Sequence, residues 1–155
     1  MAAPPQGAPK IHRWSDDVYA LAAQDVLDPK RFIRLFFSGS QESRAKGAEF
    51  LKRISARTVD RDEATDLATR DAQLEAIARW GIPDPSKLAR LAAITVPALV
   101  ANGDNDPMMI TENSYLLAHH LANAQLRIYP DAGHGFLDQY PEQFADHVNA
   151  FLGGG

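Results

Sequence analysis

Asp106 and His134 are the residues whose types and spacing could support proton-transfer chemistry. Asp106 follows the apolar stretch PALVANG at 97–103, and His134 lies in PDAGHGF, at the end of the stretch 124–130. If the two stretches are strands of one right-handed strand–helix–strand unit, they run in parallel, and ligands sit outside their carboxyl ends. A carboxylate beside an imidazole fixes the imidazole tautomer and stabilises the imidazolium formed by proton transfer. The sequence therefore predicts an acid–base pair at one edge of a sheet.

Simpler interpretations of these residues remain open at this point. Asp104 competes with Asp106 as the acid, and both could be turn formers, because aspartate favours turns. His134 could be a structural loop histidine. Gly133 and Gly135 flank it and permit a tight loop with close backbone approach, which favours a functional position.

The residues around this pair predict an α/β fold. In ITVPALVAN at 94–102, the odd-numbered and the even-numbered positions are both mostly apolar, which is typical of a strand buried on both faces. AQLRIYP at 124–130 alternates apolar with polar residues, as a half-covered strand does. Helices are predicted at 111–121, between the strands, and at 141–152, after them.

Five helices are predicted before residue 94, with Ser, Asp and Pro marking their starts. The first begins after Ser15. The second, third and fourth span 29–37, 40–57 and 62–80, and the fifth follows Asp84-Pro85. Apolar residues at helical spacing predict the inward sides of the third and fourth helices: Ala48, Leu51 and Ile54, and Ala64, Leu67, Leu74 and Ile77.

A central parallel strand needs a neighbour on each side, and 124–130 is the only other strand predicted. The other edge of 96–101 would therefore present unpaired backbone groups beside apolar side chains. Either another chain covers this edge, or the sequence is a piece of something longer.

Composition excludes several function classes. The 155 residues suit one domain, and a net charge of −4 gives no basic surface for nucleic acid. The sequence has no cysteine, which excludes a disulfide framework and a thiolate nucleophile. No signal peptide or membrane span is predicted, and a reduced, cytoplasmic setting is expected. Neither a metal nor another cofactor is expected: His119 and His120 are adjacent on a helix and point about 100° apart, so both can hardly bind one ion.

Residues 94–152 resemble the C-terminal part of the α/β-hydrolase fold superfamily. The matching stretches are PALVANGDNDPMM, similar to the strand and G-x-x-D of that family, and YPDAGHGFLDQYPEQF, similar to its histidine loop and last helix. The resemblance implies that Asp106 is the triad acid and His134 the base. It also implies a helical lid at 13–92 and the C-terminal part of the core at 93–152. The small, proline-rich composition of the first residues predicts a flexible lead-in at 1–12, and the final glycines predict a tail at 153–155.

The sequence departs from the family pattern because it contains no G-x-S-x-G nucleophile motif. We therefore expect the C-terminal portion of a hydrolase acting on an ester, lactone or related small apolar molecule, inactive alone and completed by a nucleophile-bearing N-terminal half. The alternative is a non-catalytic module that self-associates or binds a partner chain at the open edge of 96–101.

Four apolar residues could line the substrate pocket or simply pack in the core: Met108, Met109, Phe136 and Trp80. The aromatic group at 32, 36 and 37 and Trp80 are more typical of a lid core than of an acyl pocket.

Overall fold

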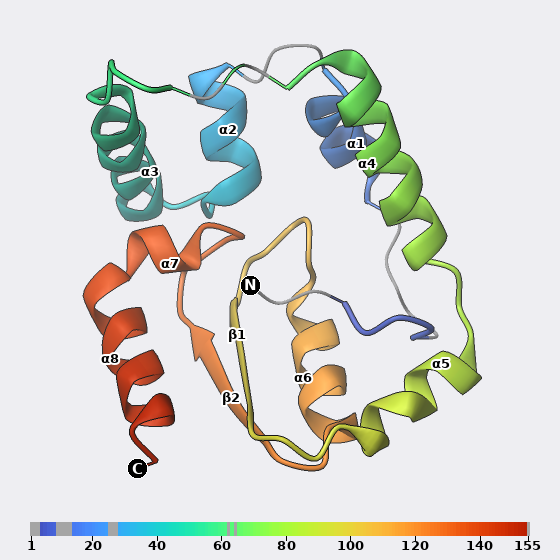
Figure 1. Ribbon diagram of the computed structural model, residues 1–155. Coiled ribbons are helices and arrows are strands. Elements are labelled where there is room, and N and C mark those ends of the chain that lie inside the picture. The colour runs from blue at the N-terminus through green and yellow to red at the C-terminus, as the bar shows by residue number, and fades with distance from the viewer. Residues whose placement is uncertain (1–3, 9–13, 25–27, 62, 64, 155) are drawn as a thin grey trace.

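The computed structural model describes residues 4–8, 14–24, 28–61, 63 and 65–154, in which a helical segment precedes a small α/β unit (Figure 1). The helical segment contains α1 (Asp16–Ala22), α2 (Pro29–Phe36), α3 (Gln41–Ser55), α4 (Leu67–Trp80), α5 (Pro85–Ala89) and the 3₁₀ helix η1 (Arg90–Ala93). The α/β unit contains β1 (Ala98–Gly103), α6 (Thr111–His120), β2 (Ala124–Tyr129), α7 (Phe136–Gln139) and α8 (Pro141–Leu152). The predicted α/β class is confirmed.

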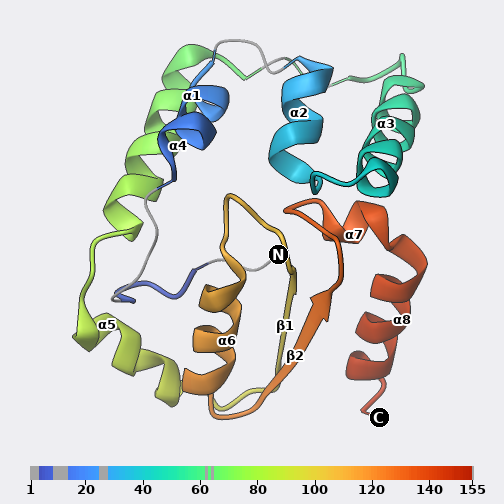
Figure 2. The same cartoon turned by 180° about the vertical axis from the view of Figure 1, so that it is seen from behind.

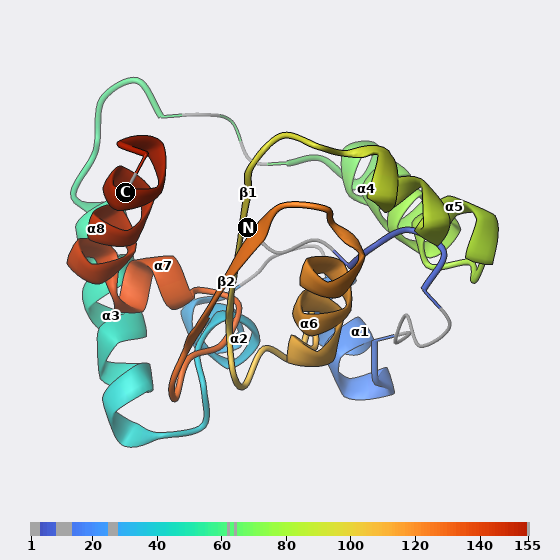
Figure 3. The ribbon, with the colours of Figure 1, turned by 90° about the horizontal axis from the view of Figure 1, so that it is seen from below.

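β1 and β2 pair in parallel, with Ala98 opposite Ala124 and Gly103 opposite Tyr129. The connecting helix α6 covers one face of this pair, and α7 and α8 lie on the other face (Figure 3). Helices α1–α4 lie beyond the carboxyl ends of both strands (Figures 1 and 2). The loops that follow β1 and β2 therefore face the helical segment, where a ligand of a parallel sheet would bind.

β1 is buried over its last four residues. Residues 100–103 are buried and residues 98–99 are half-buried, whereas Val96 is 65% exposed and Ile94 is also exposed. The prediction that 94–102 is buried on both faces is therefore wrong for its first residues. They precede the strand, and no second neighbouring strand covers them in the described part of the chain.

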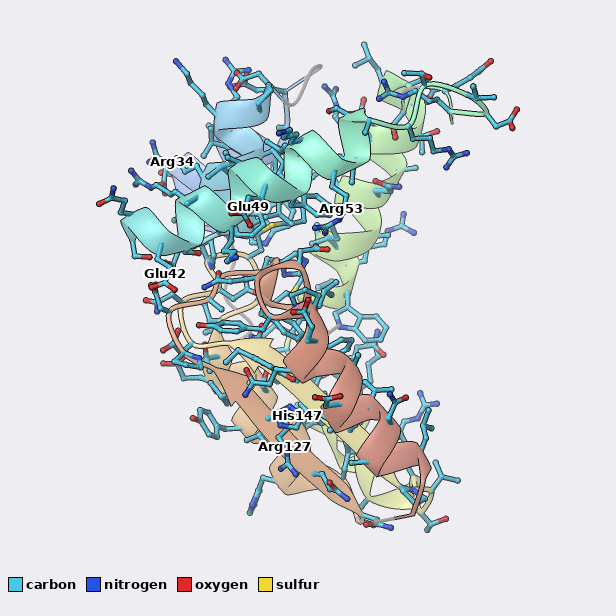
Figure 4. The ribbon with its side chains drawn as sticks, turned by 90° about the vertical axis from the view of Figure 1, so that its left-hand side faces the viewer. Arg34, Glu42, Glu49, Arg53, Arg127 and His147 are labelled. Atoms are coloured by element: carbon cyan, nitrogen blue, oxygen red, sulfur yellow. The ribbon has the colours of Figure 1, made fainter. Side chains whose placement is uncertain are left out.

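The core of the α/β unit is built around Tyr129 at the end of β2. The predicted alternation of β2 is confirmed for residues 125–128, but Tyr129 is only 1% exposed. Its ring stacks on Phe136 with 5.1 Å between centroids, and Phe144 of α8 packs against both rings. Its hydroxyl lies 2.7 Å from Nδ1 of His147, which faces β2 from α8 (Figure 4). The short helix α7, which the sequence analysis did not predict, brings Phe136 into this core.

Polar caps begin most helices of the helical segment. In each case the side-chain oxygen of the residue before the helix accepts a hydrogen bond from a backbone N–H of the first turn. The capping residues are Asp28, Ser40, Asp66 and Asp84. The predicted starts of α2, α3 and α5 are confirmed. α4 starts at Leu67 instead of near residue 62, because the capping aspartate is Asp66.

The inward side predicted for α4 is wrong. Leu67 and Ile77 are exposed, Leu74 is half-buried, and no described residue of this helix is buried. Ala64 lies outside the described residues. α4 lies at the edge of the helical segment (Figures 1 and 2), so most of its surface has no neighbour among the described residues to cover it.

α3 is buried along a different side from the predicted one. Of the three predicted residues, Ala48 and Ile54 are exposed and Leu51 is half-buried, whereas Ser43 and Gly47 are buried. A Cβ atom at Gly47 would lie 2.8 Å from the ring of Phe37, so glycine allows this ring to pack directly on the helix backbone.

None of the helices in the described ranges combines the length and apolar character needed to cross a membrane.

Candidate active site

Asp106 is held by the backbone of its own loop. Its side chain is fully buried, and Oδ1 accepts hydrogen bonds from the backbone N–H groups of Met108 and Met109, both at 2.8 Å. These two bonds stabilise the negative charge of the carboxylate and fix its plane. The second oxygen, Oδ2, points across to the loop that follows β2.

His134 meets Asp106 from that second loop. Its Nδ1 lies 2.8 Å from Oδ2 of Asp106, and its side chain is 12% exposed. Because a carboxylate only accepts hydrogen bonds, Nδ1 donates, and Nε2 keeps the lone pair that could take up a proton. Nε2 has no hydrogen-bond partner among the described residues. The ring of Phe36, from the end of α2, packs edge-on against the imidazole with 5.3 Å between centroids.

Asp104, the alternative acid, joins the two loops, and none of its hydrogen bonds is to His134. Its Oδ1 accepts the N–H of Ala132 at 3.1 Å, and its own N–H donates to the carbonyl of Tyr129 at 3.0 Å. The neighbouring Asn105 donates its N–H to the carbonyl of Ala132 at 2.9 Å. These bonds continue the pairing of β1 and β2 and keep Asp106 and His134 within reach of one another.

Gly103 allows the histidine loop to lie directly against the end of β1. A Cβ atom at this position would be 2.1 Å from the carbonyl oxygen of Ala132 and 2.5 Å from that of Gly133. Both neighbours are backbone atoms, which cannot swing aside as a side chain can. We expect Gly103→Ala to lower the free energy of unfolding by about 3 kcal/mol or more, measured by urea denaturation.

The matched control for this prediction is Gly39→Ala, because no atom lies within 4 Å of a Cβ built at Gly39. This variant should unfold within about 0.5 kcal/mol of the parent chain. Equal unfolding free energies for the two variants would contradict the close approach at Gly103.

The residues predicted to bind substrate are dispersed. Met108 lines a cavity of about 230 Å³ together with Trp14, Leu35, Phe36, Leu74 and Ile77, and neither Asp106 nor His134 is part of its lining. Met109 uses its backbone to hold Asp106 and to accept a hydrogen bond from the side chain of Asn102. Phe136 is 1% exposed and packs in the core under Tyr129.

Trp80 lies in a different place from the acid–base pair. Its indole N–H donates to the carbonyl of Pro4 at 2.8 Å, and its ring lines a second cavity with residues of α5 and η1. Neither Asp106 nor His134 lines that cavity.

The adjacent residues His119 and His120 stack edge-on at 5.4 Å between centroids, and no cluster of metal-ligating side chains occurs within the described ranges.

The sequence analysis missed two connections between the helical segment and the site. The indole N–H of Trp14 donates to the carbonyl of Met108 at 3.0 Å, which joins the start of α1 to the acid loop. Asp131 binds Ser38 and Ser40 at the corner between α2 and α3. Residues more than 90 positions apart form these contacts, and no spacing rule in the sequence relates them.

A carboxylate–imidazole pair at the carboxyl ends of adjacent parallel strands, beneath a layer of helices, is the arrangement of the α/β-hydrolase fold. The model of the dienelactone hydrolase family matches residues 63–151. The chain belongs to the dienelactone hydrolase family.

Solved structures show the same fold. An α/β-hydrolase fold protein from Chitinophaga pinensis is 41% identical over 97% of this chain, with a TM-score of 0.85. Est816, described as an N-acyl homoserine lactone degrading enzyme, is 22% identical over 88% of this chain, with a TM-score of 0.60. A thermophilic esterase from Thermogutta terrifontis is 18% identical over 97%, with a TM-score of 0.58. The chain spans about half the length of these proteins: 53%, 48% and 52%.

Proposed function

We propose that this chain supplies the acid and the base of a hydrolase triad, and that a segment outside this sequence supplies the nucleophile. The observation that carries the proposal is the 2.8 Å contact between Nδ1 of His134 and Oδ2 of the buried Asp106. The sequence contains no G-x-S-x-G motif, so the attacking hydroxyl is assigned to the remaining part of the enzyme.

His134 acts as the general base through Nε2. It removes the proton of the attacking hydroxyl while that oxygen bonds to the substrate carbonyl carbon, and Asp106 stabilises the resulting imidazolium. The imidazolium then gives the proton to the departing alkoxide. In the second half of the reaction, water loses a proton to Nε2 as it attacks the acyl-enzyme, and the proton returns to the nucleophile's oxygen.

The cavity lined by Phe36 and Met108, which contact His134 and Asp106 respectively, supports a small apolar ester or lactone as the substrate. Phe36 contacts the imidazole and Met108 follows the acid, so both residues connect this cavity of about 230 Å³ to the reacting groups. Most of its lining is apolar, with Arg70 and Gln73 as the polar exceptions. Such a pocket suits an acyl group no larger than a short chain or a single ring. Helices α1, α2 and α4 each contribute residues to the cavity, and helices α1 to α4 are assigned as the lid; neither Trp80 nor Phe136 lines the cavity.

Reconstitution tests this proposal directly. The chain is co-expressed with the part of the Chitinophaga pinensis protein that it does not match, and hydrolysis of p-nitrophenyl acetate is measured. We expect hydrolysis by the purified complex and none by either piece alone. Hydrolysis by the 155-residue chain alone would reveal an overlooked nucleophile, and an inactive but well-formed complex would contradict the proposal.

The open edge of β1 supports a second candidate, a non-catalytic module that associates with itself. β1 pairs only with β2 among the described residues, and Val96 beside it is 65% exposed. An edge of this kind pairs readily with another strand. Light scattering distinguishes the candidates: a dimer that the missing hydrolase segment cannot dissociate favours the module, and a monomer that binds that segment favours the hydrolase.

A further inference from the structure

Asp131 connects the histidine loop to the corner between α2 and α3. Its Oδ1 accepts the hydroxyl of Ser38 and its Oδ2 accepts the hydroxyl of Ser40, both at 2.5 Å. These two hydroxyl groups lower the pKa of the Asp131 carboxyl, so the charged form is the one that binds them. The backbone at Asp131 has a φ of 50°, in the left-handed region that aspartate, asparagine and glycine tolerate best.

The same corner contacts the loop on the other side of His134. The N–H of Gly135 donates to the carbonyl of Phe36 at 2.5 Å, and the ring of Phe36 packs on the imidazole. A Cβ atom at Gly133 would be 2.7 Å from that carbonyl oxygen. The residues on both sides of His134 therefore lie against the end of α2.

A buried chain of hydrogen bonds fixes the corner itself. The hydroxyl of Ser43 accepts the N–H of Ser38 at 2.9 Å and donates to Oε1 of Gln139 at 2.6 Å. The amide of Gln139 donates to the backbone carbonyl of Asp131 at 2.9 Å. These hydrogen bonds connect the corner to α3, α3 to α7, and α7 back to Asp131. They therefore fix the positions of the Asp131 carboxylate and of both serine hydroxyls relative to one another.

We propose that Asp131 is a positioning residue for His134, which it orients by holding Phe36 against the imidazole ring. Asp106 contacts the ring at Nδ1 alone, and one hydrogen bond leaves the ring able to tilt about that contact. The Phe36 ring provides the second contact, and its position depends on the corner that Asp131 holds. Small displacements of a catalytic group are costly to the rate, so a second contact matters. The proposal rests on the proposed function only in that His134 is the base.

Two substitutions separate the carboxylate from the backbone geometry. Asp131→Gly keeps the left-handed conformation and removes both hydrogen bonds, whereas Asp131→Asn tolerates the conformation and keeps one acceptor oxygen. Amide hydrogen exchange and the ¹⁵N chemical shifts of the His134 ring are measured by NMR on the 155-residue chain, without any assay of activity.

In Asp131→Gly, we expect the amide of Gly135 to exchange about tenfold faster or more, the factor that corresponds to losing a charge-assisted hydrogen bond. The ring shifts of His134 should move toward a mixture of the two tautomers. Asp131→Asn should lie between Asp131→Gly and the parent chain. Ser38→Ala, which removes one partner from the corner, should change the Gly135 exchange rate less when Asp131 is already glycine than it does in the parent chain.

Asp138→Ala provides the matched control, because Asp138 of α7 pairs with Arg53 of α3 at 3.7 Å across the same interface. It should leave the Gly135 amide and the His134 ring unchanged. The proposal is overturned if Asp131→Gly leaves the His134 ring shifts unchanged, or if it accelerates the β1 and β2 amides as much as that of Gly135, since this would indicate general destabilisation. If both readouts respond as expected while the reconstituted complex is inactive, the proposed function fails and the positioning contact stands.

Discussion

Replacing His134 with alanine is expected to lower kcat of the reconstituted hydrolase by about 10⁴-fold or more. The imidazole is the ring bound to Asp106, and its Nε2 has no hydrogen-bond partner among the described residues, so its loss removes the acceptor for the nucleophile's proton. The measurement is hydrolysis of p-nitrophenyl acetate by the complex, with single-turnover kinetics to isolate acylation.

His119→Ala serves as the control for this substitution. His119 is exposed on α6, and its ring packs edge-on against the ring of its neighbour His120. Its removal should change kcat less than twofold. A His134→Ala complex that retained more than one-tenth of the parent kcat would show that another group accepts the proton.

Asp106→Asn is expected to lower kcat by about 10⁴-fold while the fold is kept. The asparagine carbonyl can replace Oδ1 and accept the N–H groups of Met108 and Met109, which directs the new NH₂ group at His134. Because that group donates, it favours an imidazole that accepts at Nδ1 and carries its proton on Nε2. The wrong tautomer cannot act as a base. Kinetics of the complex measure the loss, and ¹⁵N shifts of the ring identify the tautomer.

Asp104→Asn separates the two aspartates of this loop. Its remaining carbonyl oxygen can still accept the N–H of Ala132, so kcat should fall less than tenfold. A larger loss at Asp104 than at Asp106 would reverse the assignment of the acid.

The sequence predicted the strand–helix–strand unit because its signals are local. Alternation at 125–128, capping residues at 28, 40 and 84, and the glycines around His134 each act within a few residues. The proximity of Asp106 and His134 also followed from local signals, since two parallel strands joined by one helix must end at the same edge.

Burial was less predictable, because it depends on which elements meet. Val96, Ile77 and Leu67 have the apolar character of core residues, yet in this chain they face outward. Phe136 does not belong to a helical or alternating pattern of apolar residues, and its place under Tyr129 depends on the short helix α7. Asp131 resembles any aspartate in a turn until the corner between α2 and α3 is placed over it.

The hydrogen bond between Gly135 and Phe36 and those of Asp131 also affect how a molecule could reach the reacting groups. The edge of the helical layer formed by α2 and α3 is fastened to the histidine loop, whereas α4 has no buried residue within the described part of the chain. The smaller cavity is bordered by α1 and α4 as well as by Phe36. Entry between α1 and α4 would therefore open the hydrogen bond from Arg70 of α4 to the carbonyl of Ala23, at 2.9 Å, whereas entry past Phe36 would displace the contacts of the histidine loop.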